Sequence, residues 1–218
     1  MIDAAPLIRH EVVLGRSEQG RPIVAWETGD PKAKRRVLVV GCIHGNEVAG
    51  IAVANAVARA HVPAGTDVWV VPDLNPDGVA AGTRQNGRGV DLNRNFPYRW
   101  QPLRGIYYSG PRALSERESR IAYRLIRRIH PTTSIWFHQH LGLVDESGGD
   151  VRVERRFARL VGMRTTQLAR YPGSVAGWEN HAFPGTTAFV VELPAGPVPP
   201  QRLGVFTHAI LSWPTARS

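Results

Sequence analysis

Six short runs of apolar residues are spaced along the chain, and they predict the strands of a β-sheet. In chain order they read EVVLG, PIVAWETG, RRVLVVGCI, DVWVVPDLN, TSIWFHQ and TAFVVELP. Several of these runs are continuously apolar and rich in β-branched residues, which is typical of central strands buried on both faces. We therefore expect a sheet that is covered on both sides.

Helical patterns lie between the predicted strands. Residues 47–60 are rich in alanine and valine, and a second pattern covers residues 115–130. The second pattern begins with Ser115 and Glu118, which have the spacing of a capping box, and it stops before Pro131. Strands that alternate with helices predict an α/β fold, a single domain over residues 1–218. Its central sheet is expected to be mixed, mostly parallel and covered by helices on both faces.

The composition agrees with one ordinary globular domain. The chain has 218 residues, of which 43% are hydrophobic, and can bury a core without disulfides. No stretch approaches the roughly 18 to 20 apolar residues of a membrane span. The amino terminus, MIDAAPLIRHEVVLG, lacks the basic start and apolar segment of a signal peptide. We expect the chain as given to be cytoplasmic, with export left open if the natural amino terminus is longer.

The formal net charge of +9 would attract anionic partners. Arginine carries nearly all of this charge, and it is scattered through predicted helices such as SERESRIAYRLIRRIH. The chain has no run of five or more Lys/Arg residues and no aromatic RNA-binding signature. We interpret the charge as a solvated arginine-rich surface. A small anionic substrate is therefore expected in place of a specific nucleic-acid partner.

Polar residues follow four of the predicted strands. His44, Asn75, His138 and Glu192 each lie at the end of a strand or just after it. In open α/β sheets, ligands bind at the carboxyl ends of the strands. Residues 75–111 show neither the helical nor the strand period, and a long structureless segment in a compact domain is usually functional. The sequence therefore predicts one site at this edge of the sheet.

The residue types at these strand ends are those of a hydrolytic zinc site, which typically uses two His and one Glu and leaves one position for water. His44 and Glu47 could supply two ligands, and His138 is the strongest candidate for the third. Glu192 fits a base that takes a proton from the zinc-bound water. Taken alone, Glu47 is also explained as an acidic residue at a helix start. Cys42, the only cysteine, lies inside a strand and is interpreted as core packing.

The loop motifs NPDG, TRQN and GVDLNRNFP resemble the zinc carboxypeptidase family related to carboxypeptidase A, in particular its bacterial murein peptide amidase branch. GRSEQGRPI, HGNE, FHQH, YPGS and VVELP also occur in the order of that family, so the likeness covers roughly residues 15–194. The resemblance implies a zinc metallopeptidase that hydrolyses an amide bond next to a residue with a free carboxylate. In the murein branch, this bond joins the γ-carboxyl of D-glutamate to diaminopimelate.

Carried over position by position, the resemblance assigns roles in catalysis. One zinc ion would be bound by His44, Glu47 and His138, and Glu192 would activate its water. Arg84, in TRQN, matches the arginine that stabilises the oxyanion of the tetrahedral intermediate.

The resemblance also assigns substrate contacts. Asn93 and Arg94, in LNRN, match the pair that binds the free carboxylate of the substrate, a task that suits a planar guanidinium. Tyr171 resembles a substrate-contacting tyrosine on a mobile loop, but its spacing to the following Gly-Ser pair is shorter, so packing or loop anchoring stays open. His140 shares its side of the strand with His138, and the register of the motif favours His138 as the ligand.

Substrate specificity is the least determined property. The segment GSVAGW holds no acidic residue that would select a basic terminal residue, although Glu179 follows it directly. Two other functions fit parts of the pattern. A deacylase for N-acyl amino acids, of the succinylglutamate desuccinylase and aspartoacylase type, shares HGNE-like and DLNR-like elements. A catalytically silent binder of cell-wall peptides is the third interpretation, and the intact ligand set argues against it.

Overall fold

The computed structural model describes residues 9–212, and the strands of this part form one seven-stranded sheet. The strands are β1 (Arg9–Arg16), β2 (Pro22–Gly29), β3 (Arg35–Val40), β4 (Thr66–Val71), β5 (Thr133–Asp145), β6 (Arg164–Thr166) and β7 (Thr187–Pro194). Their order is β1-β2-β4-β3-β5-β6, and β7 pairs with β5. The β1–β2 and β2–β4 pairs are antiparallel and the other pairs are parallel. The predicted mixed, mostly parallel sheet is confirmed.

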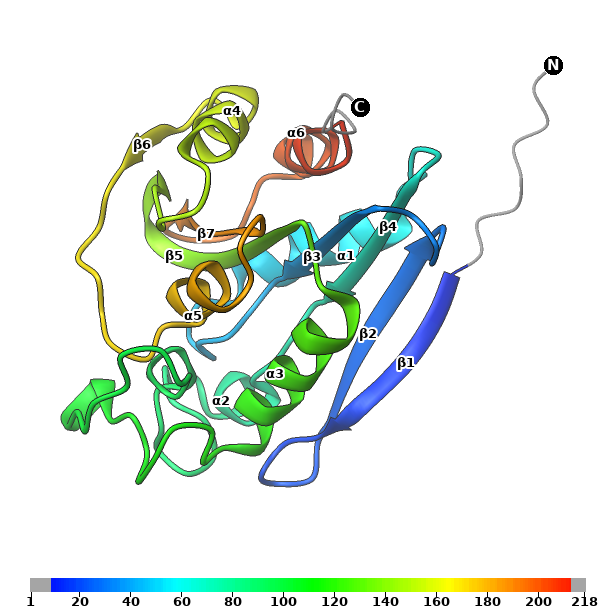
Figure 1. Cartoon of the computed structure of the whole chain (residues 1–218). Helices are drawn as coiled ribbons and strands as arrows, with labels where there is room; N and C mark the ends of the chain where they lie inside the picture. The colour runs from blue at the N-terminus through cyan, green and yellow to red at the C-terminus, as the bar shows by residue number, and fades with distance from the viewer. Residues whose placement is uncertain (1–8, 213–218) are drawn as a thin grey trace, which may run out of the picture.

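Helices cover both faces of the sheet (Figure 1). One face carries α1 (Ala49–Arg59), α4 (Val151–Val161) and α6 (Pro200–Leu211), and the other carries α3 (Arg117–Ile129) and α5 (Val175–Ala182). Alternate residues of the central strands supply the two halves of the core. In β3, Val37 and Val39 pack with α1, whereas Leu38 and Val40 pack toward α3. This double burial explains why β3 is apolar at each of the four positions from Val37 to Val40.

The predicted strands are all observed, with differences at some ends, and several further elements are present. The strand β5 continues past the predicted run, which ends at Gln139, as far as Asp145. The three-residue β6 and the helices α5 and α6 were not predicted. The prediction of a capping box at the start of α3 is wrong, because the N-cap is Glu116 and its side chain does not cap the helix. Glu118 accepts instead from the Glu18 N–H and the Asn86 side chain.

The segment 75–111 contains short elements that its composition did not predict. A six-residue helix, α2 (Pro76–Ala81), begins at Asn75, whose side chain accepts from the Gly78 N–H, and two 3-10 turns cover Leu92–Arg94 and Gly105–Tyr107. The start of α2 packs on the turn after β3. A Cβ at Gly45 would lie 1.9 Å from the carbonyl carbon of Gly78. Glycine at position 45 therefore allows the metal-site turn and α2 to come into contact.

No helix between residues 9 and 212 is long and apolar enough to cross a membrane. The first eight residues of the amino-terminal stretch lie outside the described part of the chain. The cytoplasmic location expected from the sequence stays a prediction.

Candidate active site

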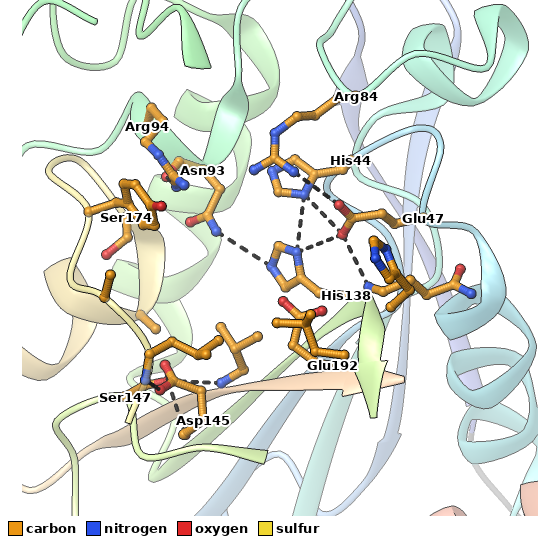
Figure 2. Close-up of a pocket in the computed structure, with 18 of the residues that line it drawn as sticks. His44, Glu47, Arg84, Asn93, Arg94, His138, Asp145, Ser147, Ser174 and Glu192 are labelled. Atoms are coloured by element: carbon orange, nitrogen blue, oxygen red, sulfur yellow. Dashed lines mark hydrogen bonds and ion pairs between the residues drawn. The ribbon is translucent and has the colours of Figure 1, made fainter. Parts of the chain in front are cut away.

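Three groups suited to binding a metal ion come together at the end of β3. His44 follows β3, Glu47 precedes α1, and His138 lies within β5, which pairs with β3. The Nδ1 atoms of His44 and His138 lie 3.0 and 2.9 Å from Glu47 Oε2, and they lie 3.1 Å from each other. Figure 2 shows all three side chains turned toward one point. They are the predicted zinc ligands, and the structure brings them together.

Asp91 holds this cluster from behind, and the sequence analysis did not identify it. Its buried carboxylate contacts His44 Nε2 at 3.0 Å through Oδ1 and accepts from Arg84 Nε at 2.9 Å through Oδ2. An acceptor at Nε2 keeps the proton on that nitrogen and leaves the lone pair of Nδ1 facing the cluster. Arg84 Nη1 also donates to Glu47 Oε1 at 3.0 Å. Its guanidinium is therefore fixed by two carboxylates beside the cluster.

The charges of the cluster shift the pKa values of its members. Burial raises the pKa of the Glu47 carboxyl, but hydrogen bonds with His138 and His44 outweigh it and hold the pKa well below its usual range. Burial also opposes ionisation of Asp91, yet the contacts with His44, together with the charges of Arg84 and Arg94, lower its pKa. Burial lowers the pKa of His44, and Asp91 and Glu47 more than reverse that effect. Both carboxyl groups are therefore ionised at neutral pH.

Glu192, the predicted base, lies on β7 directly beside His138, its register partner on β5. Its side chain lines the same cleft as the metal cluster. Its Oε2 is buried, and no group among the described residues 9–212 donates a hydrogen bond to it. A buried carboxylate oxygen without a protein partner is costly and points to a role for a ligand or a reacting group.

Asn93 and Arg94 lie across the cleft from Glu47 (Figure 2). Arg94 is buried and donates from Nη1 to the Asn93 carbonyl oxygen, while its Nε has no partner within the described residues. Burial lowers the pKa of Arg94, and Asp91 opposes that effect. Asn93 is used within the protein, since its Oδ1 accepts from Val175 N–H at 2.9 Å and its Nδ2 lies 3.5 Å from His138 Nε2.

Two tyrosines enclose the outer side of Arg94. The Arg94 Cζ lies 4.2 Å from the ring centroid of Tyr171 and 5.4 Å from that of Tyr107, and the two rings stack 5.7 Å apart. Tyr171 is thus placed against the predicted carboxylate-binding arginine at the cleft. Gly173 supports this loop with a φ of +70°, and a Cβ there would lie 2.2 Å from the Arg94 carbonyl oxygen.

The remaining candidates are separated by position. His140 is exposed and lines the cleft, but it is outside the His44–Glu47–His138 cluster. Cys42 is fully buried, and burial raises the pKa of its thiol, as expected of a core residue. Glu179, on α5, is buried against β5, where it accepts from Ser134 Oγ and Trp136 Nε1, and it is not among the residues that line the cleft. It is therefore not an acid that selects a basic substrate.

The cleft has a volume of about 620 Å³ and extends from the metal cluster to the end of β5. Sequence reasoning missed Asp91, Tyr107, Asp145 and Arg170, which all contact site residues or line the cleft. Only Asp91 had a signal, because it and Asp77 are the only acidic residues between positions 75 and 111.

Comparison with known proteins identifies the family. The sequence pattern of the zinc carboxypeptidases matches residues 2–144. The chain belongs to the zinc carboxypeptidase family. The matched range of this zinc carboxypeptidase contains the whole His44–Glu47–His138 cluster, and Glu192 and Tyr171 lie beyond it.

Relatives of this chain include murein peptide amidase A of Escherichia coli K12. It is 31% identical over 146 residues, which cover 61% of this chain and 60% of that protein, so the chain spans about 60% of the length of this relative. The crystal structure of murein-tripeptide amidase MpaA from Escherichia coli O157 has a TM-score of 0.75 at 25% identity, covering 94% of this chain and 93% of that one. Carboxypeptidase A from Helicoverpa armigera has a TM-score of 0.80 at 18% identity, covering 94% of this chain and 67% of that one, and shares the fold.

Proposed function

We propose that this zinc carboxypeptidase hydrolyses an amide bond next to a residue with a free carboxylate. One observation carries the proposal. The two-histidine, one-glutamate cluster opens onto the same cleft as the side chains of Glu192 and Arg94. A metal-binding group, a base and a fixed cation thus surround one space.

The donor set fits zinc. His44, Glu47 and His138 offer one donor atom each within 4.8 Å of one another, the ligand types and number of a catalytic zinc site. The Asp91 carboxylate contacts His44 Nε2, and such an acceptor behind a metal-binding histidine fixes the orientation of its ring and the position of its proton. When bound, zinc supplies a Lewis acid that polarises the scissile carbonyl and lowers the pKa of water to about 7.

The protein side chains supply the remaining chemistry. The Glu192 carboxylate takes a proton from the attacking water and later delivers it to the leaving amine. Arg84, fixed by Asp91 and Glu47, places a positive charge where the oxyanion develops. Arg94 lines the cleft and its Nη1 donates to the Asn93 carbonyl oxygen, so the remaining Nη N–H groups of the guanidinium can donate to the terminal carboxylate of the substrate. Direct binding of that carboxylate by Asn93 stays a prediction, because its amide contacts Val175 and His138.

The proposed substrate is a murein peptide, cleaved between the γ-carboxyl of D-glutamate and diaminopimelate. Support comes from the likeness to the murein-tripeptide amidase structure, which extends over 94% of this chain and 93% of that one. The formal charge of +9 also favours an anionic peptide of this kind.

The direct test measures zinc content and hydrolysis of a murein tripeptide by the wild type and by Glu192→Gln. We expect one zinc ion per chain in both proteins. The kcat of the variant should fall by about 10²- to 10⁴-fold, the range for a general base. Glu11→Gln, at an exposed position on β1, is the matched control and should behave as wild type. Unchanged turnover in Glu192→Gln would remove the proposed mechanism.

The same assay separates the two alternative functions. Preferential hydrolysis of N-acyl aspartate or N-acyl glutamate over the tripeptide would favour a deacylase. Binding of the tripeptide without any product, abolished by a chelator, would favour a silent binder.

A further inference from the structure

The end of the cleft away from Arg84 has its own chemistry. Figure 2 shows Asp145 and Ser147 at this end, across the cleft from the arginine. The walls come from the end of β5, from residues 168–171 before α5, and from the first turn of α5. Ala176 and Gly177 on that turn are small, so the cleft retains depth at this end.

An ion pair closes this end of the cleft. The Asp145 Oδ1 accepts from Leu168 N–H at 2.8 Å, and its Oδ2 accepts from Ser147 Oγ at 2.7 Å and from Arg170 Nη1 at 3.0 Å. Three of the roughly four acceptor positions of the carboxylate are therefore occupied by the protein. The Asp145 side chain is 8% exposed and that of Arg170 is 37% exposed. The group that this pair offers to a ligand is the cation.

Arg170 has donors left for such a ligand. A guanidinium carries five N–H groups. Two of them are engaged, one with Asp145 and one with the Glu146 carbonyl oxygen. Leu168 and Val190 line the approach with apolar surface. A substrate side chain with an aliphatic part and a terminal carboxylate would match this end of the cleft: the aliphatic part would contact Leu168 and Val190, and the carboxylate would reach the Arg170 guanidinium.

We infer that this end of the cleft is the side-chain subsite for the terminal residue of the substrate, and that Arg170 binds a second carboxylate at the end of that side chain. The inference rests on the proposed peptidase function and names its substrate class, a dicarboxylic amino acid with a chain long enough to cross the apolar wall. Asp145 does not make the subsite select a basic side chain, because its charge is paired with Arg170 and its oxygens are occupied.

The test compares four γ-D-glutamyl dipeptides with the zinc-loaded protein. Their terminal residues are diaminopimelate, 2-aminopimelate (distal carboxylate only), lysine (distal amine only) and norleucine (neither). We expect kcat/KM of the wild type to favour the two residues with a distal carboxylate by about 10- to 100-fold, the range of a charge-assisted hydrogen-bonded pair. Arg170→Gln should lose most of this preference while kcat/KM for the norleucine dipeptide stays near that of the wild type.

Two further variants separate recognition from loop anchoring. Arg170→Lys keeps the charge and loses the forked donors, so it should retain part of the preference. Arg152→Gln, which removes a surface arginine paired with Asp150 on α4, is the matched control and should keep the full preference. The bond between Asp145 and the Leu168 N–H survives in every variant. An equal loss with all four dipeptides in Arg170→Gln, or a preference for lysine in the wild type, would overturn the inference.

Calorimetric binding of free 2-aminopimelate and norleucine tests the subsite without turnover. The wild type should bind 2-aminopimelate more tightly, and Arg170→Gln should reduce the difference in Kd. If this discrimination is found but no dipeptide is cleaved, the subsite stands and the proposed function fails. If dipeptides are cleaved but Arg170→Gln changes neither the preference in kcat/KM nor the difference in Kd, the proposed function stands and the subsite fails.

Discussion

At the scale of single residues, the metal cluster depends on groups that do not themselves face the metal position. Asp91 contacts His44 Nε2, and Arg84 links Asp91 to Glu47. The Gln139 N–H donates to Glu47 Oε2 at 3.2 Å, while its side chain accepts from the first N–H of α1. His44 and Glu47 are therefore oriented before a metal ion arrives, which lowers the cost of assembling the site.

Asp91→Asn tests this support directly. The substitution keeps the size of the side chain and removes the charge that fixes the Nε2 proton of His44. We expect zinc affinity to fall about 10- to 100-fold, the usual effect of losing such a partner. Competition with a chromophoric chelator measures it. Asp150→Asn, at the N-cap of α4, is the control and should leave the affinity unchanged. Equal zinc affinity in Asp91→Asn and wild type would show that His44 is oriented by packing alone.

At the scale of elements, α5 is joined to the sheet by a buried acid. Glu179 on α5 is fully buried and accepts from Ser134 and Trp136 on β5. Burial raises its pKa from an ordinary value of 4.5 to about 7, and the two hydrogen bonds offset only part of that effect. The folded state therefore binds a proton between about pH 4.5 and 7 that the unfolded chain has lost, and stability falls as pH rises through this range.

Glu179→Gln should remove this pH dependence. Glutamine can accept from Trp136 and donate to Ser134 without ionising. As the pH rises from 4 to 8, the free energy of unfolding of the variant minus that of the wild type should increase by up to about 3 kcal/mol. Denaturant unfolding of both proteins in a chelator measures the difference, so that metal binding contributes to neither. Glu11→Gln should show no such change. A constant difference across this pH range would contradict a raised pKa at Glu179.

The elements also show which features a sequence can predict. The runs at β2 and β7 gave the observed bounds, because apolar strands flanked by turn residues are a local signal. The three residues of β6 become a strand only by pairing with the end of β5, which no local pattern encodes. The prediction of a capping box is wrong for a related reason, because the Glu118 carboxylate accepts hydrogen bonds from Glu18 and Asn86, which are distant in the chain.

The same distinction holds for the site. The predicted ligands follow strands or lie on them, so the order of the strands brought them together. Asp91 is 47 positions from His44, and Arg170 is 25 positions from Asp145. Arginine 170 stands among many surface arginines, and only its contact with a buried carboxylate at the cleft distinguishes it. Such pairings depend on tertiary structure and leave no spacing to recognise.

At the scale of the whole molecule, the metal cluster joins segments that are far apart in the chain. His44 and Glu47 connect β3 to α1, and His138 belongs to β5 in the middle of the sheet. A metal ion that binds all three groups binds the folded protein and not the unfolded chain. Folding and zinc binding are therefore linked by mass action.

Zinc should therefore stabilise the fold, and the stabilisation should identify the third ligand. At free zinc about a thousandfold above Kd, the gain is about 4 kcal/mol, or roughly 10 °C in Tm for a chain of this size. Thermal unfolding with zinc and with excess chelator measures this shift for each protein. His138→Ala should lose most of it, whatever its own Tm, and His140→Ala should retain it, because His140 lies outside the cluster. The opposite result would show that His140 is the third ligand. It would also require a different arrangement of β5 at the metal, because the two histidines lie on either side of Gln139, whose N–H donates to Glu47.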